Sequence, residues 1–278
     1  MAEGVLYLVG VPIGNYGDMT FRAVETLKSV DVIAAEDTRR AKKLLSHFAV
    51  MPERLLAHHD HNERDSAEGL LAFLQQGRDV ALITDAGMPS VSDPGFYLAR
   101  QTQKAGGQVK VVPGVSAVPT ALAVSGLPAD DFRFAGFLPR KKGQRAKRLE
   151  ELKPQTATLV FFESPRRTLG TLEDLLEHLG DRKACLCREL TKTHEEILPA
   201  SLRELAQTLS ARDEVLGEVT LVVAGASAEE SQLTDTALEK LILSGLEEGH
   251  TPKSLRDSLS NRYGLRKKDV YHKILSLK

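Results

Sequence analysis

The stretch LYLVGVPIGNYGDMTFRAV, residues 6–24, contains the pattern that decides the fold of the first part of the chain. An apolar, strand-like run leads into a loop with glycines at positions 10, 14 and 17, and a segment with helical periodicity follows. Such an order is typical of a ligand-binding turn in a parallel sheet. The glycines do not follow the G-x-G-x-x-G spacing, and Pro12 removes a backbone N–H that a phosphate would use. The loop therefore argues against a pyrophosphate ligand, although a plain tight turn would fit it as well.

The same alternation of short apolar runs and helical patterns continues to about residue 112. Apolar runs without alternation suit strands that are buried on both faces of a parallel sheet. Strands are expected at 5–9, 32–35, 80–84 and 109–112, and helices at 21–29, 39–47, 66–76 and 95–104. Right-handed strand–helix–strand units then follow from the general connection rules. The sequence predicts an α/β domain over residues 1–117.

The pattern changes near residues 113–128, where small residues and three prolines indicate a crossover into a second α/β domain, residues 118–226. Strands are expected there at 132–137, 158–163, 184–189 and 218–224, and helices at 144–152, 167–179 and 201–210. Residues 225–235 resemble a linker. The remainder, within 227–278, reads as a small helical unit with a helix that starts at Thr251–Pro252 and ends at Gly264, followed by another helix.

The composition is that of an ordinary soluble protein. The 278 residues have a formal net charge of -1, with 42% hydrophobic and 27% charged residues, which excludes a globally basic nucleic-acid coat but leaves room for local basic patches. No signal-peptide pattern is visible, and the most apolar stretch, 116–127, is too short to span a bilayer. Cys185 and Cys187 would share one face of a strand, which suits buried free thiols in a reducing compartment. A cytoplasmic protein without membrane contact is expected.

Two further loops follow expected strands and so lie where ligands bind in open parallel sheets. TDAGMPSVSDPG, residues 84–95, has two Gly/Pro pairs that leave backbone groups outside regular ladders, where a neutral or zwitterionic ligand could use them. VPGVSA, residues 112–117, places Ser116 as a helix cap or a ligand contact. HHDHNERD, residues 58–65, would leave only His59 and His61 on one face of a strand, so no metal site is expected there.

Several longer motifs together resemble the tetrapyrrole methylase superfamily and, within it, the branch of 2′-O-ribose methylases of 16S ribosomal RNA. The motifs span residues 4 to about 225 and are PIGNYGDMT (12–20), AAEDTRR (34–40), DAGMPSVSDPG (85–95), PGVSA (113–117), GFLPRK (136–141), FESPRR (162–167) and RELTKTHEE (188–196). The resemblance implies a two-domain α/β fold, each domain a sheet with flanking helices, and a homodimer that acts on a cytidine of 16S rRNA in the small ribosomal subunit. It also implies S-adenosylmethionine (AdoMet) as the methyl donor, a cation without phosphates, which agrees with the loop that contains Pro12.

The resemblance and the loop positions together give the candidate site residues. The cofactor-binding candidates are Pro12, Gly14, Asp85, Ala86, Gly87, Ser90, Ser116, Ala117, Phe162 and Val222. Glu36, Asp37 and Glu163 are candidates for the base that takes the proton of a ribose hydroxyl. A helix N-cap with acids in the first turn is the alternative interpretation of Glu36 and Asp37. A third acidic constellation, with Glu189, leaves the choice of base open.

Two basic runs favour an RNA substrate. Residues 139–153 contain seven Lys or Arg and two acidic residues, and residues 250–278 contain eight Lys or Arg and two Asp, in a pattern similar to a helix–turn–helix unit. The RNA-binding candidates are Arg39, Arg40, His61, Asn62, Arg140, Lys141, Lys142, Arg145, Arg166, Lys192, Lys267 and Lys268. A methylase of small tetrapyrroles and a non-catalytic RNA-binding assembly factor are the alternative functions, and solvated helix faces are the alternative interpretation of the basic runs.

Overall fold

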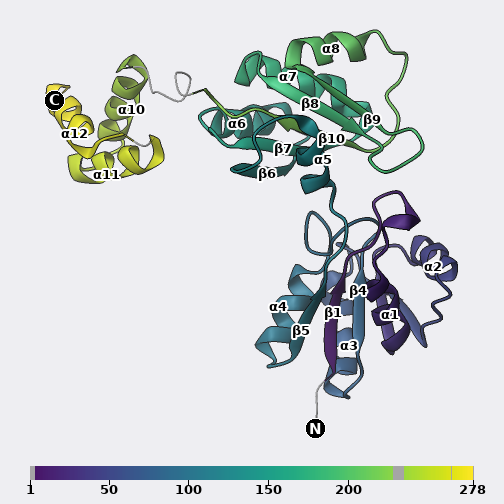
Figure 1. The fold of residues 1–278 in the computed structure, drawn as a ribbon. Helices are drawn as coiled ribbons and strands as arrows, with labels where there is room; N and C mark the ends of the chain where they lie inside the picture. Colours follow the sequence, from purple (N-terminus) through teal and green to yellow (C-terminus); the bar gives the residue numbers. More distant parts are fainter. Residues whose placement is uncertain (1–3, 228–234, 264, 278) are drawn as a thin grey trace.

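The computed structural model describes residues 4–227, 235–263 and 265–277. Two α/β units follow each other along the chain, and a small helical unit completes it (Figure 1). The first unit is a sheet of five parallel strands in the order β3-β2-β4-β1-β5. These strands are β1 (Val5–Val9), β2 (Val32–Ala35), β3 (Arg54–Ala57), β4 (Val80–Ile83) and β5 (Gln108–Val112).

Helices cover both faces of this first sheet. They are α1 (Phe21–Ser29), α2 (Thr38–His47), α3 (Glu63–Gln75) and α4 (Phe96–Lys104), with a short 3-10 turn, η1 (Tyr16–Asp18), before α1. One buried cluster joins the strands to α1 and α2, and another joins them to α3 and α4. Every residue of the central strands β2 and β4 is therefore buried, which explains their short runs of continuous apolar sequence, VIAA and VALI.

The second unit is a mixed five-stranded sheet in the order β6-β7-β10-β8-β9. Its strands are β6 (Phe132–Phe137), β7 (Thr158–Glu163), β8 (Lys183–Arg188), β9 (Glu196–Ser201) and β10 (Val219–Val223). Only β6 and β7 pair in parallel, and the remaining pairs are antiparallel. Its helical elements are α5 (Ala117–Ser125), α6 (Lys142–Leu152), η2 (Pro165–Arg167), α7 (Thr168–Leu179) and α8 (Leu202–Ser210).

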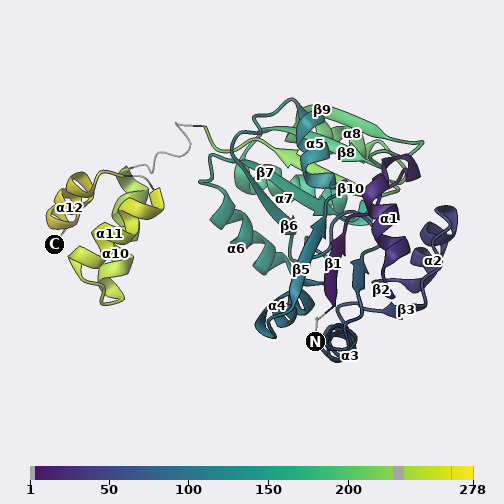
Figure 2. The ribbon, with the colours of Figure 1, turned by 60° about the horizontal axis from the view of Figure 1, so that its bottom comes forward.

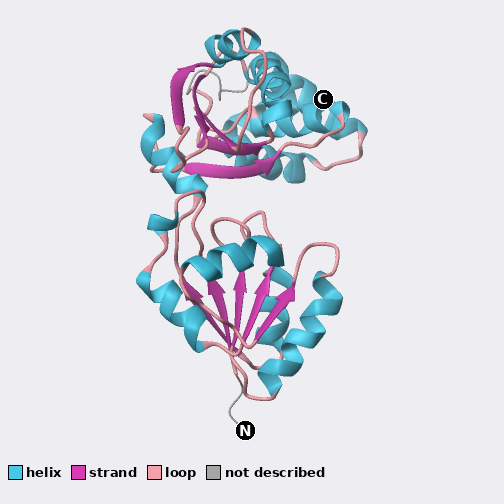
Figure 3. Ribbon diagram, turned by 90° about the vertical axis from the view of Figure 1, so that its right-hand side faces the viewer, coloured by secondary structure: helices cyan, strands magenta, loops and turns pink. Residues whose placement is uncertain are grey.

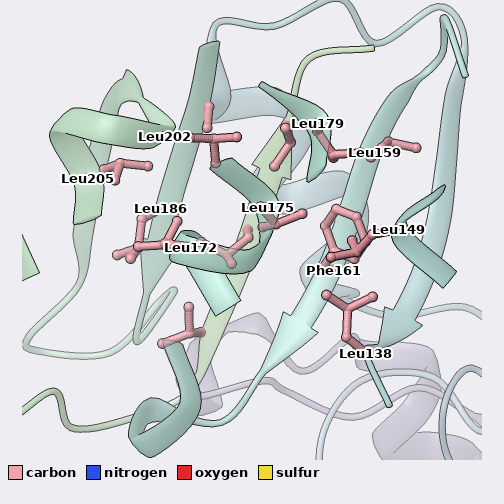
Figure 4. Packing of buried hydrophobic residues seen from close by; sticks show 14 of the residues in the cluster. Leu138, Leu149, Leu159, Phe161, Leu172, Leu175, Leu179, Leu186, Leu202 and Leu205 are labelled. Atoms are coloured by element: carbon pink, nitrogen blue, oxygen red, sulfur yellow. The ribbon is translucent and has the colours of Figure 1, made fainter. Parts of the chain in front are cut away.

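The largest core lies on the face of the second sheet that α6, α7 and α8 cover. Leucines of these helices pack against Phe161 and its neighbours on β7, β8 and β10 (Figure 4). Helix α5 packs on the opposite face, where Ala121 and Leu122 meet the alternate residues of the same strands. Ile13 of the first unit belongs to this α5 cluster, so the two units share a buried apolar contact.

The C-terminal unit consists of α10 (Asp235–Glu247), α11 (Pro252–Tyr263) and α12 (Lys267–Ser276). It has its own small core, which includes Ile242, Val270 and Ile274. Figures 1 and 2 both show these helices apart from the two α/β units. The predicted helix start at Thr251–Pro252 is confirmed, whereas Gly264 and most of the expected linker lie outside the described residues.

Most expected elements are confirmed to within a few residues, and the α/β fold class is confirmed. The sequence interpretation missed β3, β9 and α5. It took residues 113–128 as a crossover because of their prolines, but Pro119 lies in the first turn of α5, where a missing N–H costs no helical hydrogen bond. Cys185 and Cys187 are buried and free, as expected. No helix in the described ranges has the length and apolarity to cross a membrane.

Candidate active site

The loops after β1, β2, β4 and β5 meet at the edge of the first sheet that faces the second unit. Figure 3 shows the five strands directed toward that unit. At the neighbouring strands β4 and β1 the chain leaves the sheet toward opposite faces, because α1, which follows β1, covers one face and α4, which follows β4, covers the other. This divergence opens a crevice at the carboxyl end of β4, which is the usual ligand position in a doubly wound sheet.

Backbone contacts fix the first loop against the loops after β4 and β5. Val11 N donates to Gly87 O at 2.9 Å, and Gly87 N donates to Val11 O at 3.1 Å. A Cβ atom on Gly10 would lie 2.6 Å from the backbone nitrogen of Gly114, and Gly87 has a φ of +78°. These glycines are therefore needed for close backbone approach and for a left-handed turn, in place of an anion cradle.

The loop from residue 84 to 95 adopts an irregular backbone. Ser90 and Ser92 have φ values of 70° and 63°, which non-glycine residues rarely adopt. Glu63 at the start of α3 stabilises the end of this loop, because its Oε1 accepts from Gly95 N at 3.1 Å and from Tyr97 N at 3.3 Å. The strained backbone at Ser90 and Ser92 and the fixed end at Gly95 together hold the part of the loop between Ser90 and Gly95 beside the crevice.

A pocket of about 210 Å³ lies between this loop and the second unit. From the first unit its lining residues are Ile13, Ala86, Gly87, Met88, Val91, Ser92, Asp93, Ser116 and Ala117. From the second unit they are Phe137, Phe162, Glu163, Glu218, Val219 and Thr220, at the end of β6 and β7 and the start of β10. The pocket therefore exists only where the two α/β units meet.

The pocket wall combines apolar surface with carboxyl groups, of which Glu163 and Glu218 are paired with Arg167 and Lys192 outside the lining. Its lining residues include three carboxyl side chains, Asp93, Glu163 and Glu218, but no lysine, arginine or histidine. The ring of Phe162 packs at 5.7 Å, centroid to centroid, from that of Phe137. A wall of this kind suits a ligand with an apolar or aromatic part and a positive charge, and it disfavours a phosphate.

Asp93 is the carboxyl group whose environment is most unusual. Burial raises the pKa of Asp93 to about 7, and repulsion by Glu36, Asp85 and Asp60 contributes in the same direction. The side chain is only partly buried and lines the pocket. A carboxyl with a pKa near neutrality in a pocket is suited to accept a proton. Asp93 belongs to the stretch TDAGMPSVSDPG but was not among the predicted bases, which were Glu36, Asp37 and Glu163.

Glu36 lies at the same edge and has a backbone partner. Its Oε2 accepts from Asp85 N at 3.2 Å, and burial raises the pKa of Glu36. Asp85 in turn accepts from Asp37 N at 3.1 Å and pairs with Arg40 at 3.2 Å. Neither Glu36 nor Asp85 is among the pocket-lining residues, so they bracket the crevice from the side of α2.

Asp37 caps helix α2. Its side chain accepts from Arg39 N at 2.8 Å, and it forms a two-point ion pair with the Arg39 guanidinium, at 3.2 and 2.8 Å. Hydrogen bonds from Arg39 lower the pKa of Asp37 well below its ordinary value. The helix-cap interpretation is therefore confirmed for Asp37, whereas the first turn of α2 contains none of the expected acidic residues. A carboxylate that is stabilised in this way makes a poor base.

Glu163 lines the pocket but its carboxylate is already occupied. Its Oε2 accepts from Thr171 Oγ1 at 2.7 Å and lies 3.3 Å from Arg167 Nη2, while Oε1 accepts from Ser164 N at 2.8 Å. The side chain is fully buried. Glu163 therefore holds the end of β7 to the start of α7.

The motif around Gly14 contacts the motif around Glu189, although they are far apart in sequence. A Cβ atom on Gly14 would lie 2.4 Å from Cγ of Lys192. Lys192 Nζ is fixed by Glu189 at 2.8 Å and by Glu218 at 3.0 Å. Glu189 is thus held in an ion pair and also accepts from Glu218 N at 2.8 Å.

The predicted cofactor residues fall into two groups. Ala86, Gly87, Ser116, Ala117 and Phe162 line the pocket. The others lie in the surrounding shell: Pro12, Gly14, Asp85, Ser90 and Val222. Val222 is fully buried in the α5 cluster, and its side chain supports the floor of the site without lining it. Ser116 is the N-cap residue of α5 but makes no side-chain cap bond.

The predicted RNA contacts do not form one surface. Arg39, Arg40, His61, Arg140, Lys141, Lys142, Arg166, Lys267 and Lys268 are exposed, while Asn62, Arg145 and Lys192 are half-buried. Arg145 pairs with Asp174 at 2.5 Å, and Lys267 pairs with Asp257 at 3.3 Å. The exposed set is distributed over α2, the start of α3, the loop before α6 with the first residue of α6, η2 and α12.

The histidine-rich segment serves the start of α3. His58 is buried with its Nδ1 2.7 Å from Ser66 Oγ, and Asn62 accepts from His59 N at 2.8 Å. Asn62 is the N-cap residue of α3, but its side chain bonds the preceding loop in place of the helix. Within the ranges that the structure describes, no group of three or more His, Cys, Asp or Glu is placed to hold a metal ion.

Comparison with known proteins gives one consistent result. A family model described as tetrapyrrole (corrin/porphyrin) methylases matches residues 5–206. A protein of Halalkalibacterium halodurans named ribosomal RNA small subunit methyltransferase I is 50% identical over 224 residues, which are 80% of this chain and 76% of that protein. A protein of the same name from Mesorhizobium japonicum is 45% identical over 277 residues, 99% of this chain and 93% of that one.

Solved structures agree on the fold. The uroporphyrin-III-C-methyltransferase from Thermus thermophilus has a TM-score of 0.56 and 25% identity, over 80% of this chain and 94% of that chain. The methyltransferase CobJ has a TM-score of 0.60 at 21% identity, over 80% and 95% of the two chains. On these matches, the chain belongs to the tetrapyrrole (corrin/porphyrin) methylase family, and within it to the group of relatives named ribosomal RNA small subunit methyltransferase I.

Proposed function

We propose that this protein transfers a methyl group from AdoMet to the 2′-hydroxyl of a cytidine ribose in 16S rRNA. The observation that carries the proposal is the pocket between the two α/β units, which has three carboxyl groups and no basic side chain. The group of relatives named for ribosomal RNA supports the choice of acceptor. The proposal includes a homodimer in the cytoplasm, where small ribosomal subunits are found.

The residues of the pocket fit AdoMet. Phe137 and Phe162 offer aromatic surface for an adenine, and the backbone of the loops around Gly87 and Ser116 offers donors and acceptors for its polar atoms. The carboxyl groups of Asp93 and Glu218 favour the sulfonium and amino groups over any phosphate. When bound, AdoMet supplies an electrophilic methyl group, and no metal is needed for its transfer.

The protein's own part in the reaction is mainly positioning. A methyl transfer of this type requires the accepting oxygen about 3 Å from the methyl carbon and in line with the leaving sulfur. Residues of both α/β units line the pocket and can hold the methyl donor between them, and the crowded backbone around Gly10 and Gly114 keeps the loops rigid.

Asp93 is the carboxyl group that we assign as the base for the ribose hydroxyl. It lines the pocket, has no ion-pair partner within the described residues, and its pKa is about 7. The carboxylate of Asp37 caps helix α2, the carboxylate of Glu163 is held in an ion pair, and Glu36 lies outside the pocket. Proton removal from a poor nucleophile by a positioned base accelerates a reaction by about 10²–10⁴.

The experiment incubates the purified protein with labelled AdoMet and either small ribosomal subunits from cells that lack the modification or tetrapyrrole precursors. The proposal expects the label in a ribose 2′-O position of 16S rRNA, located by alkaline resistance of the adjacent phosphodiester bond. Label in a tetrapyrrole would favour a small-molecule methylase, and label in neither would favour the non-catalytic assembly factor; both results contradict the proposal.

A further inference from the structure

A second, smaller pocket opens on the second unit, next to the candidate active site. Its volume is about 150 Å³, and it is lined by Arg145, Arg166, Arg167, Gly170 and Thr171. The arginines come from two segments, α6 and η2, and the other two residues from the first turn of α7. This wall contains three arginines, whereas the 210 Å³ pocket between the two α/β units, called the methyl-donor pocket below, has no basic residue in its lining.

Two of the three arginines are held in place by the protein. Arg145 Nε donates to Asp174 at 2.5 Å, and Arg167 Nη2 donates to Leu138 O at 2.8 Å. Each guanidinium has five N–H groups, so both retain donors that these bonds do not use. Two arginines that are already oriented can bind an anion with little further loss of side-chain freedom.

The third arginine, Arg166, has no acidic partner. It is exposed, and within the described part of the chain it forms no ion pair or hydrogen bond. Among the described residues, Asp174 pairs with Arg145 and Glu163 with Arg167, and no acidic residue pairs with Arg166, so the pocket retains a net positive charge. An unpaired Arg166 beside the two ordered arginines is therefore suited to bind an anion.

The start of α7 adds to this field. The 12-residue helix has no acidic residue in its first turn and no side-chain cap, and the carboxylate of Glu163, which contacts Thr171, offsets part of its partial positive charge. A Cβ atom on Gly170 would have no atom within 4 Å, so the wall is open at that position. Arginines and a helix N-terminus together favour a tetrahedral oxyanion such as phosphate.

Glu163 connects this pocket to the methyl-donor pocket. It belongs to the lining of the larger pocket, and its Oε2 contacts both Thr171 and Arg167 of the smaller one, at 2.7 and 3.3 Å. An anion in the arginine pocket is therefore one carboxylate away from the site where the methyl group would be transferred. A ribose hydroxyl in a nucleic acid always lies next to a phosphodiester.

We propose that the pocket of Arg145, Arg166 and Arg167 binds a backbone phosphate of the RNA strand, close to the ribose that is methylated. This inference rests on the proposed function and adds to it the position of the substrate. The pocket fixes the strand by one phosphate and reads no base, so it sets the distance of the acceptor ribose and leaves the choice of nucleotide to other contacts.

The test uses Arg166→Ala and Gly170→Glu in the full-length protein, with Gly170→Ala and Lys104→Ala as controls. Glutamate at position 170 places a negative charge in the pocket, but an acid in the first turn of a helix also stabilises that helix. Gly170→Ala gives the gain in helix propensity without the charge. Lys104 is an exposed cation on α4 that lies outside both basic runs and does not line the pocket.

The measurements are the dissociation constant for 16S rRNA at several salt concentrations, the dissociation constant for AdoMet, and the thermal unfolding temperature. We expect Arg166→Ala and Gly170→Glu to weaken RNA binding about tenfold and to lower the salt slope by about one, with AdoMet binding unchanged. Gly170→Glu should unfold at the same or a higher temperature. The two controls should bind RNA as the unchanged protein does.

RNA affinity and salt slope that remain unchanged in both pocket variants would overturn the inference. So would an equal loss of AdoMet and RNA binding, because it would indicate a purely structural role. If inorganic phosphate binds tightly in the pocket while the variants retain RNA affinity, the anion comes from a small molecule and the inference is again wrong. A failure of the proposed function would give a different result, because the protein without substitutions would then methylate no rRNA.

Discussion

Replacement of Asp93 by asparagine should raise the stability of the protein and lower its methylation activity. The pKa of Asp93 rises from 3.8 to about 7 on folding. The folded protein therefore binds more protons than the unfolded chain between these values, and its free energy of unfolding falls as the pH rises from about 4 through about 7. At 1.36 kcal/mol per pH unit the full shift corresponds to about 4 kcal/mol, and water contact of the half-buried group lowers this to about 1–3 kcal/mol.

An asparagine side chain at this position has no charge to bury, so Asp93→Asn should gain that stability above pH 7 and little near pH 4. Its methylation rate should fall about 10²–10⁴-fold, because the base is lost. In the unchanged protein, kcat/KM should rise with pH and level off above about 7. A cation in the pocket favours the ionised carboxylate, so the break in kcat should lie at lower pH than the break in kcat/KM.

The assays are urea unfolding of both proteins at pH 4, 6 and 8, and methylation rates over the same range. Asp213→Asn is the control, because Asp213 is exposed and lies outside the pocket. The reasoning is refuted if Asp93→Asn methylates at the original rate with the original pH profile. A difference in unfolding free energy that does not grow with pH would refute the burial argument on its own.

Three other changes test single parts of the structure. Gly10→Ala should lower the free energy of unfolding by about 1–3 kcal/mol, since its Cβ would lie 2.6 Å from Gly114 N. An unchanged free energy of unfolding in chemical denaturation would contradict this close packing of the two loops. Asp37→Ala should lower the free energy of unfolding through the lost cap of α2, and Asp37→Ser should restore most of it, with methylation retained in both; a loss of activity in the serine variant would return Asp37 to the candidate bases. Lys268→Ala should lower the salt slope of rRNA binding by about one without changing AdoMet binding, and an unchanged slope would remove α12 from the RNA surface.

The sequence predicted the elements whose signals are local. Strands such as VALI, buried on both faces, and helices with a clear cap, such as α8 with Ser201 and Glu204, were found within a residue or two. Two of the four edge strands were missed, because their signals are weak: β3 is exposed at both ends, and β9 contains Pro199. Proline and small residues concealed α5, whose apolar face becomes visible only against the second sheet.

The site was predicted where a motif follows a strand, and missed where chemistry depends on distant partners. Ala86, Gly87, Ser116 and Phe162 lie in the pocket wall, as their loop positions indicated. The unusual pKa of Asp93 could not be anticipated, because it depends on burial and on three acids, two of which, Glu36 and Asp60, come from other loops. A clue was present in the sequence, since Asp93 lies between Ser92 and Pro94 in a loop that follows a buried strand.

The central claim is that the pocket between the two α/β units takes a sulfonium cation. Calorimetric titration of the full-length protein with AdoMet, with its neutral demethylated form and with ATP tests it most directly. We predict saturable uptake of AdoMet, a weaker signal for the neutral form and none for ATP, because the wall offers carboxylates and no basic group. Tight uptake of ATP together with no heat from AdoMet would contradict the account.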